Sequence, residues 1–196
     1  MSAALQRPAP PLSRVTATGF LSWPGDGLGT RYHLVDGRVA ATAPPSRRHG
    51  LIHARLGGLL DQHLRERGSP CHASVGPGVQ PRSEAKWNVR IPDLAVECDP
   101  VEDDSQVVRN PVLLIEILSP SHESVTRGNV WIHRDTPSVR EILILYFWKV
   151  GGELLRRGAG GAWPAEADPL DAGSRLRLDS IGLSVPLAEA YATSGL

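Results

Sequence analysis

The run PVLLIEIL at residues 111–118 constrains the fold of this chain more than any other segment. It is apolar except for Glu116, which is typical of a strand that is covered on both faces. A second apolar run of strand length, REILILYF, occupies residues 140–147. Between them, residues 121–135 predict a short, weakly amphipathic helix. The two runs therefore indicate strands buried inside a sheet.

The remaining elements are predicted from caps, turns and hydrophobic periodicity. Asp36-Gly37 predicts a tight hairpin turn, because glycine accepts the positive φ angles of such turns. Thr16 is typical of a helix cap, and leucines at helical spacing between Ser46 and Gly68 predict the best helix of the chain. The predicted order is a helix at 16–21, a hairpin at 31–41, a helix at 46–67, strands at 71–75, 78–82, 87–97 and 111–118, a helix at 121–135, strands at 140–147 and 151–157, a loop at 158–174, a strand at 175–178 and a helix at 185–192. This order predicts a mixed α/β (α+β) fold.

Length and composition indicate one ordinary globular domain. The chain has 196 residues and is 41% hydrophobic, which suffices for one core. Residues 1–14 contain three prolines and little periodicity, so we expect a flexible lead-in followed by a single domain at 15–196. No run of about 18 apolar residues predicts a membrane span, and the N-terminus lacks the apolar region of a secretory signal. The two cysteines, Cys71 and Cys98, form no disulfide framework, so we expect reduced thiols and a cytoplasmic protein.

Charge argues against a broad basic surface for nucleic acid, because 21 basic residues balance 21 acidic residues. The distribution is nevertheless uneven. Residues 1–68 hold nine arginines and four acids, a balance of +5, whereas residues 69–118 hold four basic and eight acidic residues, a balance of −4. The N-terminal third can therefore supply local phosphate contacts. Only two lysines, Lys86 and Lys149, occur in the chain.

A pair of acids is the strongest candidate for chemistry. Asp93 and Glu116 each lie within an apolar strand run. A buried carboxylate is costly unless it is paired or holds a metal, and two carboxylates on adjacent strands suit Mg²⁺. The alternative is ordinary structure, in which Asp93 caps a turn after Pro92 and Glu116 pairs with an arginine. If the pair is a site, both side chains should face one cleft.

Other candidate sites are weaker. His49 and His53 lie four residues apart on the long helix, but HGLIH lacks the glutamate of a zinc protease, so they are interpreted as histidines at the edge of the core. Ser119 and Ser121 lack the G-x-S-x-G context of a hydrolase nucleophile. The glycines at 76–78 and 158–161 do not join a strand to a helix as phosphate loops do.

Several segments in this order resemble the Uma-type restriction endonuclease family of the PD-(D/E)XK nuclease superfamily. They are YHLVDG at 32–37, His49 at the start of a leucine-rich helix, VRIPDLAVECD at 89–99, LLIEILSPS at 113–121 and PSVREILIL at 137–145. The similarity extends from about Thr16 to the C-terminus. It implies a restriction-endonuclease-like mixed sheet flanked by helices, binding of Mg²⁺ or Mn²⁺, and hydrolysis of phosphodiester bonds in DNA. By this resemblance Asp93 and Glu116 are the two acids, and Ile117 offers its backbone carbonyl to the metal.

The chain also departs from the family pattern. Leu118 stands where the motif has lysine. Relatives that lack this lysine use one from a D-x-x-x-K stretch on the next helix, but Thr126 and Val130 occupy those positions here. His33 stands where the family usually has an acid. The two central acids are thus kept while three polar members of the site are replaced.

Some nearby polar residues are possible substitutes. Arg127 and Asn129 lie on the same predicted helix as Val130, and Lys86 precedes Asp93 by seven residues. We also expect His33 or His49 to border the cleft. The sequence therefore predicts a weak metal-dependent DNA endonuclease, expected to be a homodimer. Two alternatives stay open: a catalytically silent module that binds nucleic acid or protein, and a dimeric scaffold in which the acids bind a structural metal.

Overall fold

The computed structural model describes residues 13–28, 30–42, 44–82, 84–101, 105–120 and 123–196. Ser121 and most of the predicted lead-in lie outside this part. The helices are α1 (Ala17–Leu21), α2 (Arg47–Glu66) and α3 (Glu123–His133), with 3₁₀ turns η1 (Ala85–Trp87) and η3 (Leu187–Tyr191). The strands are β1 (Arg31–Val35), β2 (Arg38–Thr42), β3 (His72–Val75), β4 (Gly78–Val79), β5 (Leu94–Glu97), β6 (Val107–Val108), β7 (Pro111–Leu118), β8 (Glu141–Tyr146), β9 (Gly152–Arg156), β10 (Asp168–Leu170), β11 (Arg175–Leu178) and β12 (Leu183–Pro186).

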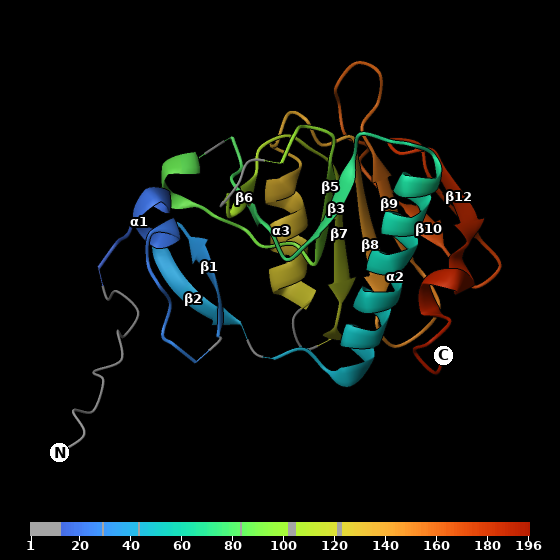
Figure 1. Cartoon of the computed structure of the whole chain (residues 1–196), viewed down its shortest axis with the longest axis horizontal. Helices are drawn as coiled ribbons and strands as arrows, with labels where there is room; N and C mark the ends of the chain where they lie inside the picture. Colours follow the sequence, from blue (N-terminus) through green and yellow to red (C-terminus); the bar gives the residue numbers. More distant parts are fainter. Residues whose placement is uncertain (1–12, 29, 43, 83, 102–104, 121–122) are drawn as a thin grey trace.

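A six-stranded mixed sheet in the order β10-β9-β8-β7-β5-β3 forms the centre of the molecule. The apolar runs predicted to be buried strands are its middle strands, β7 and β8, which pair in parallel. All other neighbours in the sheet are antiparallel. Helices α2 and α3 lie on opposite sides of this sheet (Figure 1), which confirms the predicted mixed sheet flanked by helices.

Helix α2 covers one face of the sheet. The hydroxyl oxygen of Ser46 caps it by accepting a hydrogen bond from the His49 N–H at 3.2 Å. Ile52, Leu56 and Leu60 recur at helical spacing and are fully buried. They pack in one cluster with the residues of β5, β7 and β8 that face them. Burying side chains of this size contributes roughly 1.5–3 kcal/mol each, so this face anchors the fold.

Helix α3 covers the other face and connects β7 to β8. Its Val130 packs with Leu114 and Leu118 of β7 and with Ile142 and Ile144 of β8. Because side chains alternate across a strand, Glu116 lies on this same face of β7. A single carboxylate is thus set into an apolar layer beneath α3.

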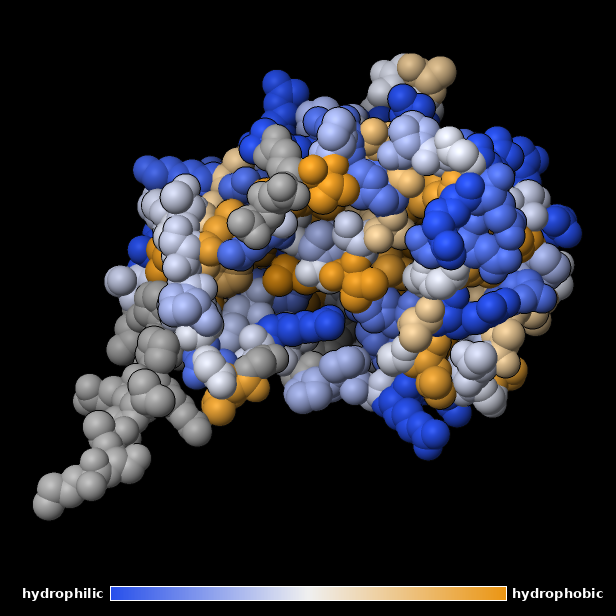
Figure 2. All heavy atoms as spheres, viewed as in Figure 1, coloured by the Kyte–Doolittle hydropathy of each residue, from blue (hydrophilic) through white to orange (hydrophobic). Residues whose placement is uncertain are grey.

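The β1–β2 hairpin and α1 form a smaller unit beside the sheet (Figure 1). Asp36 and Gly37 have φ angles of +50° and +78°, as the predicted turn requires. Leu34 exchanges backbone hydrogen bonds with Val89, which ties the hairpin to the segment that leads into β5. Figure 2 shows that the surface is hollowed between this hairpin and α2, with hydrophobic residues gathered near the middle of the view.

Some predicted boundaries were wrong. The predicted strand 78–82 has only two residues, Gly78 and Val79, which pair with β6 outside the main sheet. The predicted strand 87–97 begins only at Leu94, because Pro92 cannot donate a ladder hydrogen bond. The predicted loop 158–174 contains the edge strand β10, and the predicted helix 185–192 is the end of β12 followed by η3.

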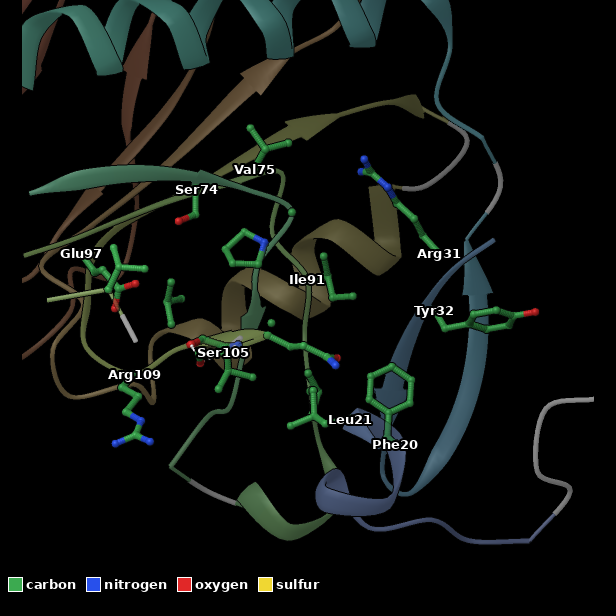
Figure 3. Close-up of a pocket in the computed structure, with 18 of the residues that line it drawn as sticks. Phe20, Leu21, Arg31, Tyr32, Ser74, Val75, Ile91, Glu97, Ser105 and Arg109 are labelled. Carbon is green, nitrogen blue, oxygen red and sulfur yellow. Dashed lines mark hydrogen bonds between the residues drawn. The ribbon is translucent and has the colours of Figure 1, made fainter. Parts of the chain in front are cut away.

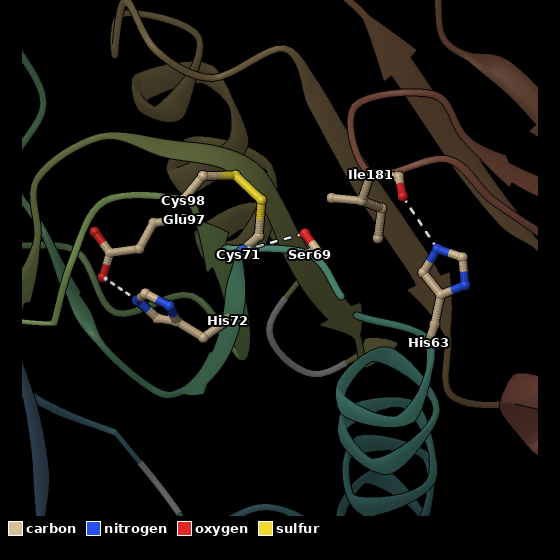
Figure 4. Close-up of a disulfide and its surroundings, with 7 residues drawn as sticks. All are labelled: His63, Ser69, Cys71, His72, Glu97, Cys98 and Ile181. Carbon is tan, nitrogen blue, oxygen red and sulfur yellow. Dashed lines mark hydrogen bonds and ion pairs between the residues drawn. A yellow bond between two sulfur atoms is a disulfide. The ribbon is translucent and has the colours of Figure 1, made fainter. Parts of the chain in front are cut away.

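The expectation of two reduced thiols was also wrong. Cys71 and Cys98 form a disulfide across a sequence separation of 27 residues (Figure 4). The register of the antiparallel pair β3–β5 sets His72 opposite Glu97, and one step further it sets Cys71 opposite Cys98. This proximity depends on strand pairing, which the spacing of the cysteines does not reveal. The argument from reduced thiols to a cytoplasmic location therefore no longer holds.

In the part of the chain that the structure describes, no helix is long and apolar enough to span a membrane. The predicted domain boundary at residue 15 stays a prediction.

We expect the disulfide to contribute measurably to stability. Closing a loop of this length restricts the unfolded chain, which typically stabilises a protein by about 2–4 kcal/mol. Dithiothreitol should therefore lower the thermal midpoint of the wild type and leave that of Cys71→Ser/Cys98→Ser unchanged. Differential scanning calorimetry with thiol titration tests this, and two titratable thiols in the unreduced, denatured protein would contradict it.

Candidate active-site cleft

The structure brings Asp93 and Glu116 to one cleft. Asp93 directly precedes β5, and the register Leu94–Ile115 sets it opposite Glu116 on β7. Its Oδ2 accepts a hydrogen bond of 2.7 Å from the backbone N–H of Ile117. Both carboxylates line a cleft of about 350 Å³. The two acids therefore share one opening between the hairpin, α2 and α3.

Two histidines of α2 hold Asp93 from the opposite side. His49 Nε2 lies 3.3 Å from Asp93 Oδ2, and His49 lines the cleft. His53 Nε2 lies 2.8 Å from the backbone carbonyl oxygen of Asp93, so it donates a hydrogen bond there. The spacing of four residues places both rings on one side of the helix, with centroids 6.2 Å apart. His49 thus contacts the acid itself, whereas His53 positions its backbone.

Glu116 is held in a more enclosed environment. Burial raises the pKa of Glu116 well above its usual value, the charge of Asp93 raises it further, and a hydrogen bond from Asn129 opposes the rise. His133 Nε2 lies 3.3 Å from Glu116 Oε1, and burial lowers the pKa of His133 to about 3, so its ring is neutral. The second acid is therefore surrounded by uncharged hydrogen-bonding groups of α3.

Arg90 forms the layer behind these groups. Its Nη1 donates to Asn129 Oδ1 at 3.4 Å and its Nη2 donates to Asn88 Oδ1 at 3.1 Å. The guanidinium is buried, and burial lowers the pKa of Arg90. Asn129 therefore connects a buried cation to the buried carboxylate of Glu116, which fixes the orientation of its amide.

His33 lines the cleft and accepts a backbone hydrogen bond there. Its Nδ1 accepts a hydrogen bond of 3.3 Å from the Ile91 N–H. Burial and the nearby charge of Arg90 lower the pKa of His33 to about 4, against a smaller opposing effect of Asp93. A neutral ring whose Nδ1 accepts must carry its proton on Nε2. His33 therefore brings a neutral group to the cleft.

Of the three residues predicted to substitute for the missing lysine, Arg127 and Lys86 do not line this cleft. Arg127 is engaged with Glu153 at 2.9 Å and with Glu123 at 2.9 Å. The ammonium of Lys86 lies over the ring of Trp87. Val130 packs in the apolar cluster beneath α3.

Thr126 and Asn129 do line the cleft. Among its described lining residues, Arg31 is the one lysine or arginine. Arg31 was missed by the sequence reasoning, as were Arg90 and His133. One signal was available for His133. Thr126, Asn129 and His133 recur at spacings of three and four residues on α3, so they form a polar stripe on one helix face.

Metal ligation would rest on few protein groups. Within the described ranges, no group of three or more His, Cys, Asp and Glu residues is arranged to hold a metal ion. The available donors are the two carboxylates and the backbone carbonyl of Ile117. Since the N–H of Ile117 points to Asp93, its carbonyl points to the same edge of β7. Such an oxygen set suits Mg²⁺, which keeps several waters and takes one or two carboxylates.

Comparison with known proteins identifies the family. The family described as "Uma2: Putative restriction endonuclease" matches residues 17–188. The chain belongs to the Uma2 family. An uncharacterized protein, slr1290, of Synechocystis sp. (strain ATCC 27184 / PCC 6803 / Kazusa) is 28% identical over 94% of this chain and 95% of its own length. The crystal structure of a putative nuclease belonging to DUF820 from Anabaena variabilis ATCC 29413 has a TM-score of 0.70 at 15% identity, over 91% of this chain and 98% of that chain. The Uma2 chain therefore has a nuclease-like fold.

The low pKa of His33 predicts a pH dependence of stability. Below pH about 6.5 the unfolded chain protonates this histidine, whereas the native state does so only near pH 4. The unfolded state then binds more protons, so acidification between these values lowers the free energy of unfolding. His33→Asn keeps a hydrogen-bond acceptor for Ile91 but cannot titrate. Urea denaturation should show that the free energy of unfolding falls less between pH 7 and pH 4.5 in this variant than in the wild type. Parallel pH profiles of the two proteins would refute the lowered pKa of His33.

Proposed function

We propose that this Uma2 protein is a metal-dependent DNA endonuclease with low activity. The observation that carries the proposal is the pair of carboxylates, Asp93 and Glu116, held at one cleft by strand register in a nuclease-like fold. Support from the family comes from its description as a restriction endonuclease family. The reaction class is hydrolysis of a phosphodiester bond.

Mg²⁺ or Mn²⁺ fits the donor set of the cleft. Burial raises the pKa of Glu116, and the negative charge of Asp93 raises it further by repulsion. A divalent cation between them relieves this repulsion. The metal would be held by these two carboxylates and the carbonyl of Ile117. When bound, it polarises the phosphoryl group and generates the attacking hydroxide.

The protein side chains position the acids and the phosphate. His49 and the Ile117 N–H fix the carboxylate of Asp93, while Asn129 and His133 fix that of Glu116. His33 offers an N–H to an anionic oxygen. Charge that develops on the phosphate needs a cation, and losing one such group typically costs on the order of 10²–10³ in rate. The absence of the family lysine is therefore the reason to expect slow turnover.

The alternative is a catalytically silent module that binds nucleic acid. It is favoured by the replacement of the family lysine by Val130, whose apolar surroundings exclude an ammonium. A homodimer and a cytoplasmic location stay predictions. Size-exclusion chromatography with light scattering tests the first, and fractionation of the source cells tests the second.

Removal of either acid should abolish cleavage. Asp93→Asn and Glu116→Gln take away charged metal ligands, so nicking of plasmid DNA with Mg²⁺ or Mn²⁺ should fall on the order of 10²-fold or more. Glu123→Gln, on the exposed surface of α3, is the control and should nick like the wild type. Wild-type protein that leaves plasmid intact under all metal conditions, while still binding DNA, would replace the endonuclease by the silent alternative.

Two neighbours on α3 should behave differently. Asn129→Ala removes the link between Glu116 and Arg90, and loss of such a supporting contact typically lowers metal affinity or activity 10- to 100-fold. Arg127→Gln disturbs only the ion pairs with Glu123 and Glu153 and should leave the rate within twofold. Initial nicking rates of both variants, measured across a metal titration, separate a change in metal affinity from a change in the maximal rate. A larger loss in Arg127→Gln than in Asn129→Ala would contradict this description of the site.

A further inference from the structure

A second and larger cavity adjoins the active-site cleft. Its volume is about 860 Å³, and it lies between β3, at the edge of the main sheet, and the unit formed by α1 and β1 (Figure 3). Arg31 and Ile91 line both this cavity and the cleft that holds Asp93 and Glu116. The cavity has the size of sites that bind small organic groups, and it shares these two lining residues with the candidate catalytic site.

Arg31 stands at the junction of the two cavities. It is exposed on β1, and among the described residues it has no hydrogen-bond or ion-pair partner. Its Nη1 lies 3.6 Å from the place where a Cβ would stand at Gly76, whose φ of +58° favours glycine. The N–H of Gly76 in turn donates to the Asp93 carbonyl oxygen at 2.9 Å. A cation that has no counter-ion in the described part of the chain is thus placed beside the backbone of Asp93, where it suits a phosphate group.

The walls of the cavity match the rest of a nucleotide. Phe20, Tyr32 and Ile91 line it with aromatic and apolar groups. The Tyr32 hydroxyl donates to Asp26 Oδ2 at 2.9 Å, which holds the ring in place. Nucleic-acid bases stack on such surfaces with little sequence preference.

The far side of the cavity is polar. Figure 3 shows Glu97 across the cavity from Arg31, and Arg109 on the same side as Glu97. Carboxylate oxygens accept hydrogen bonds from exocyclic amino groups of bases, whereas they repel phosphates. A nucleotide with its base toward Glu97 would have its phosphate toward Arg31.

We propose that this cavity holds an unpaired nucleotide next to the scissile phosphate, with Arg31 as the phosphate-binding residue. Bases in a duplex are stacked and paired, so only a single-stranded or locally open strand can insert a base here. The inference rests on the proposed nuclease function and deepens it, because it names single-stranded DNA as the preferred substrate of the same site.

Binding of DNA without cleavage tests this proposal. Fluorescence anisotropy of a labelled twelve-nucleotide single strand in EDTA should show an affinity at least tenfold higher than for a blunt duplex of the same sequence. Arg31→Gln should weaken single-strand binding about tenfold and reduce the slope of log K against log salt by about 0.7, the effect of one lost phosphate contact. Arg38→Gln, an exposed arginine of the same hairpin that lines neither cavity, is the matched control and should bind like the wild type.

A second variant tests the cavity itself. Ser74 lines it from β3, so Ser74→Trp should fill part of it and remove the preference for single strands. Circular dichroism melts establish that each variant is folded, and Ser74→Phe replaces Ser74→Trp if the latter is not. Equal affinities of Arg31→Gln and Arg38→Gln, or equal affinities of wild type for single strand and duplex, would overturn the proposal.

The same measurements distinguish this inference from the proposed function. Single-strand binding that depends on Arg31 in a protein that never cleaves supports the cavity assignment and refutes the endonuclease. Metal-dependent nicking that Asp93→Asn abolishes, without any preference for single strands, supports the endonuclease and refutes the cavity assignment.

Discussion

The hydrogen bond between the carboxylate of Asp93 and the backbone N–H of Ile117 is the contact on which the candidate site depends. At 2.7 Å it locks the start of β5 to β7 at the level of Glu116. A slip of one residue in this register would turn the side chain of Glu116 to the opposite face of the sheet. The leucine and isoleucine side chains that α2 and α3 bury on the two faces forbid that slip. Packing of the core thus determines the geometry of the acids.

The arrangement is costly, and the surrounding polar residues limit that cost. A buried carboxylate beside a second negative charge is unfavourable, as the raised pKa of Glu116 records. Asn129, His133 and Arg90 supply hydrogen bonds and one buried positive charge behind it. In a purely structural core, apolar side chains of the same volume would often stabilise the fold as well or better. Functional sites commonly contain residues that lower the stability of the fold in this way.

The sequence predicted the features that depend on neighbouring residues, and it missed those that depend on contacts between distant segments. The Asp36-Gly37 turn, the capped helix α2 and the apolar strands β7 and β8 depend on short-range patterns, and these predictions were confirmed. The disulfide, the contact of His133 with Glu116 and the position of Arg31 depend on pairing of segments far apart in the chain. The acids were found because a charge in an apolar run is itself a local anomaly. Arginine on an exposed hairpin strand is not anomalous, so its position beside the cleft gave no signal.

The cleft has no lysine among its described lining residues, and the packing around it determines where a cation can reach the site. Leu118 is fully buried on the same face of β7 as Glu116, and Val130 closes the apolar layer above it. An ammonium at either position would lie in that layer and would be expensive to keep charged. The sheet and α3 therefore leave the open side of the cleft, bounded by the hairpin, as the route for positive charge. Arg31 lies on that side, so a phosphate bound there is drawn away from α3 and toward the larger cavity. The lack of a lysine at the cleft and the proposed preference for an unpaired strand would both follow from the position of Arg31.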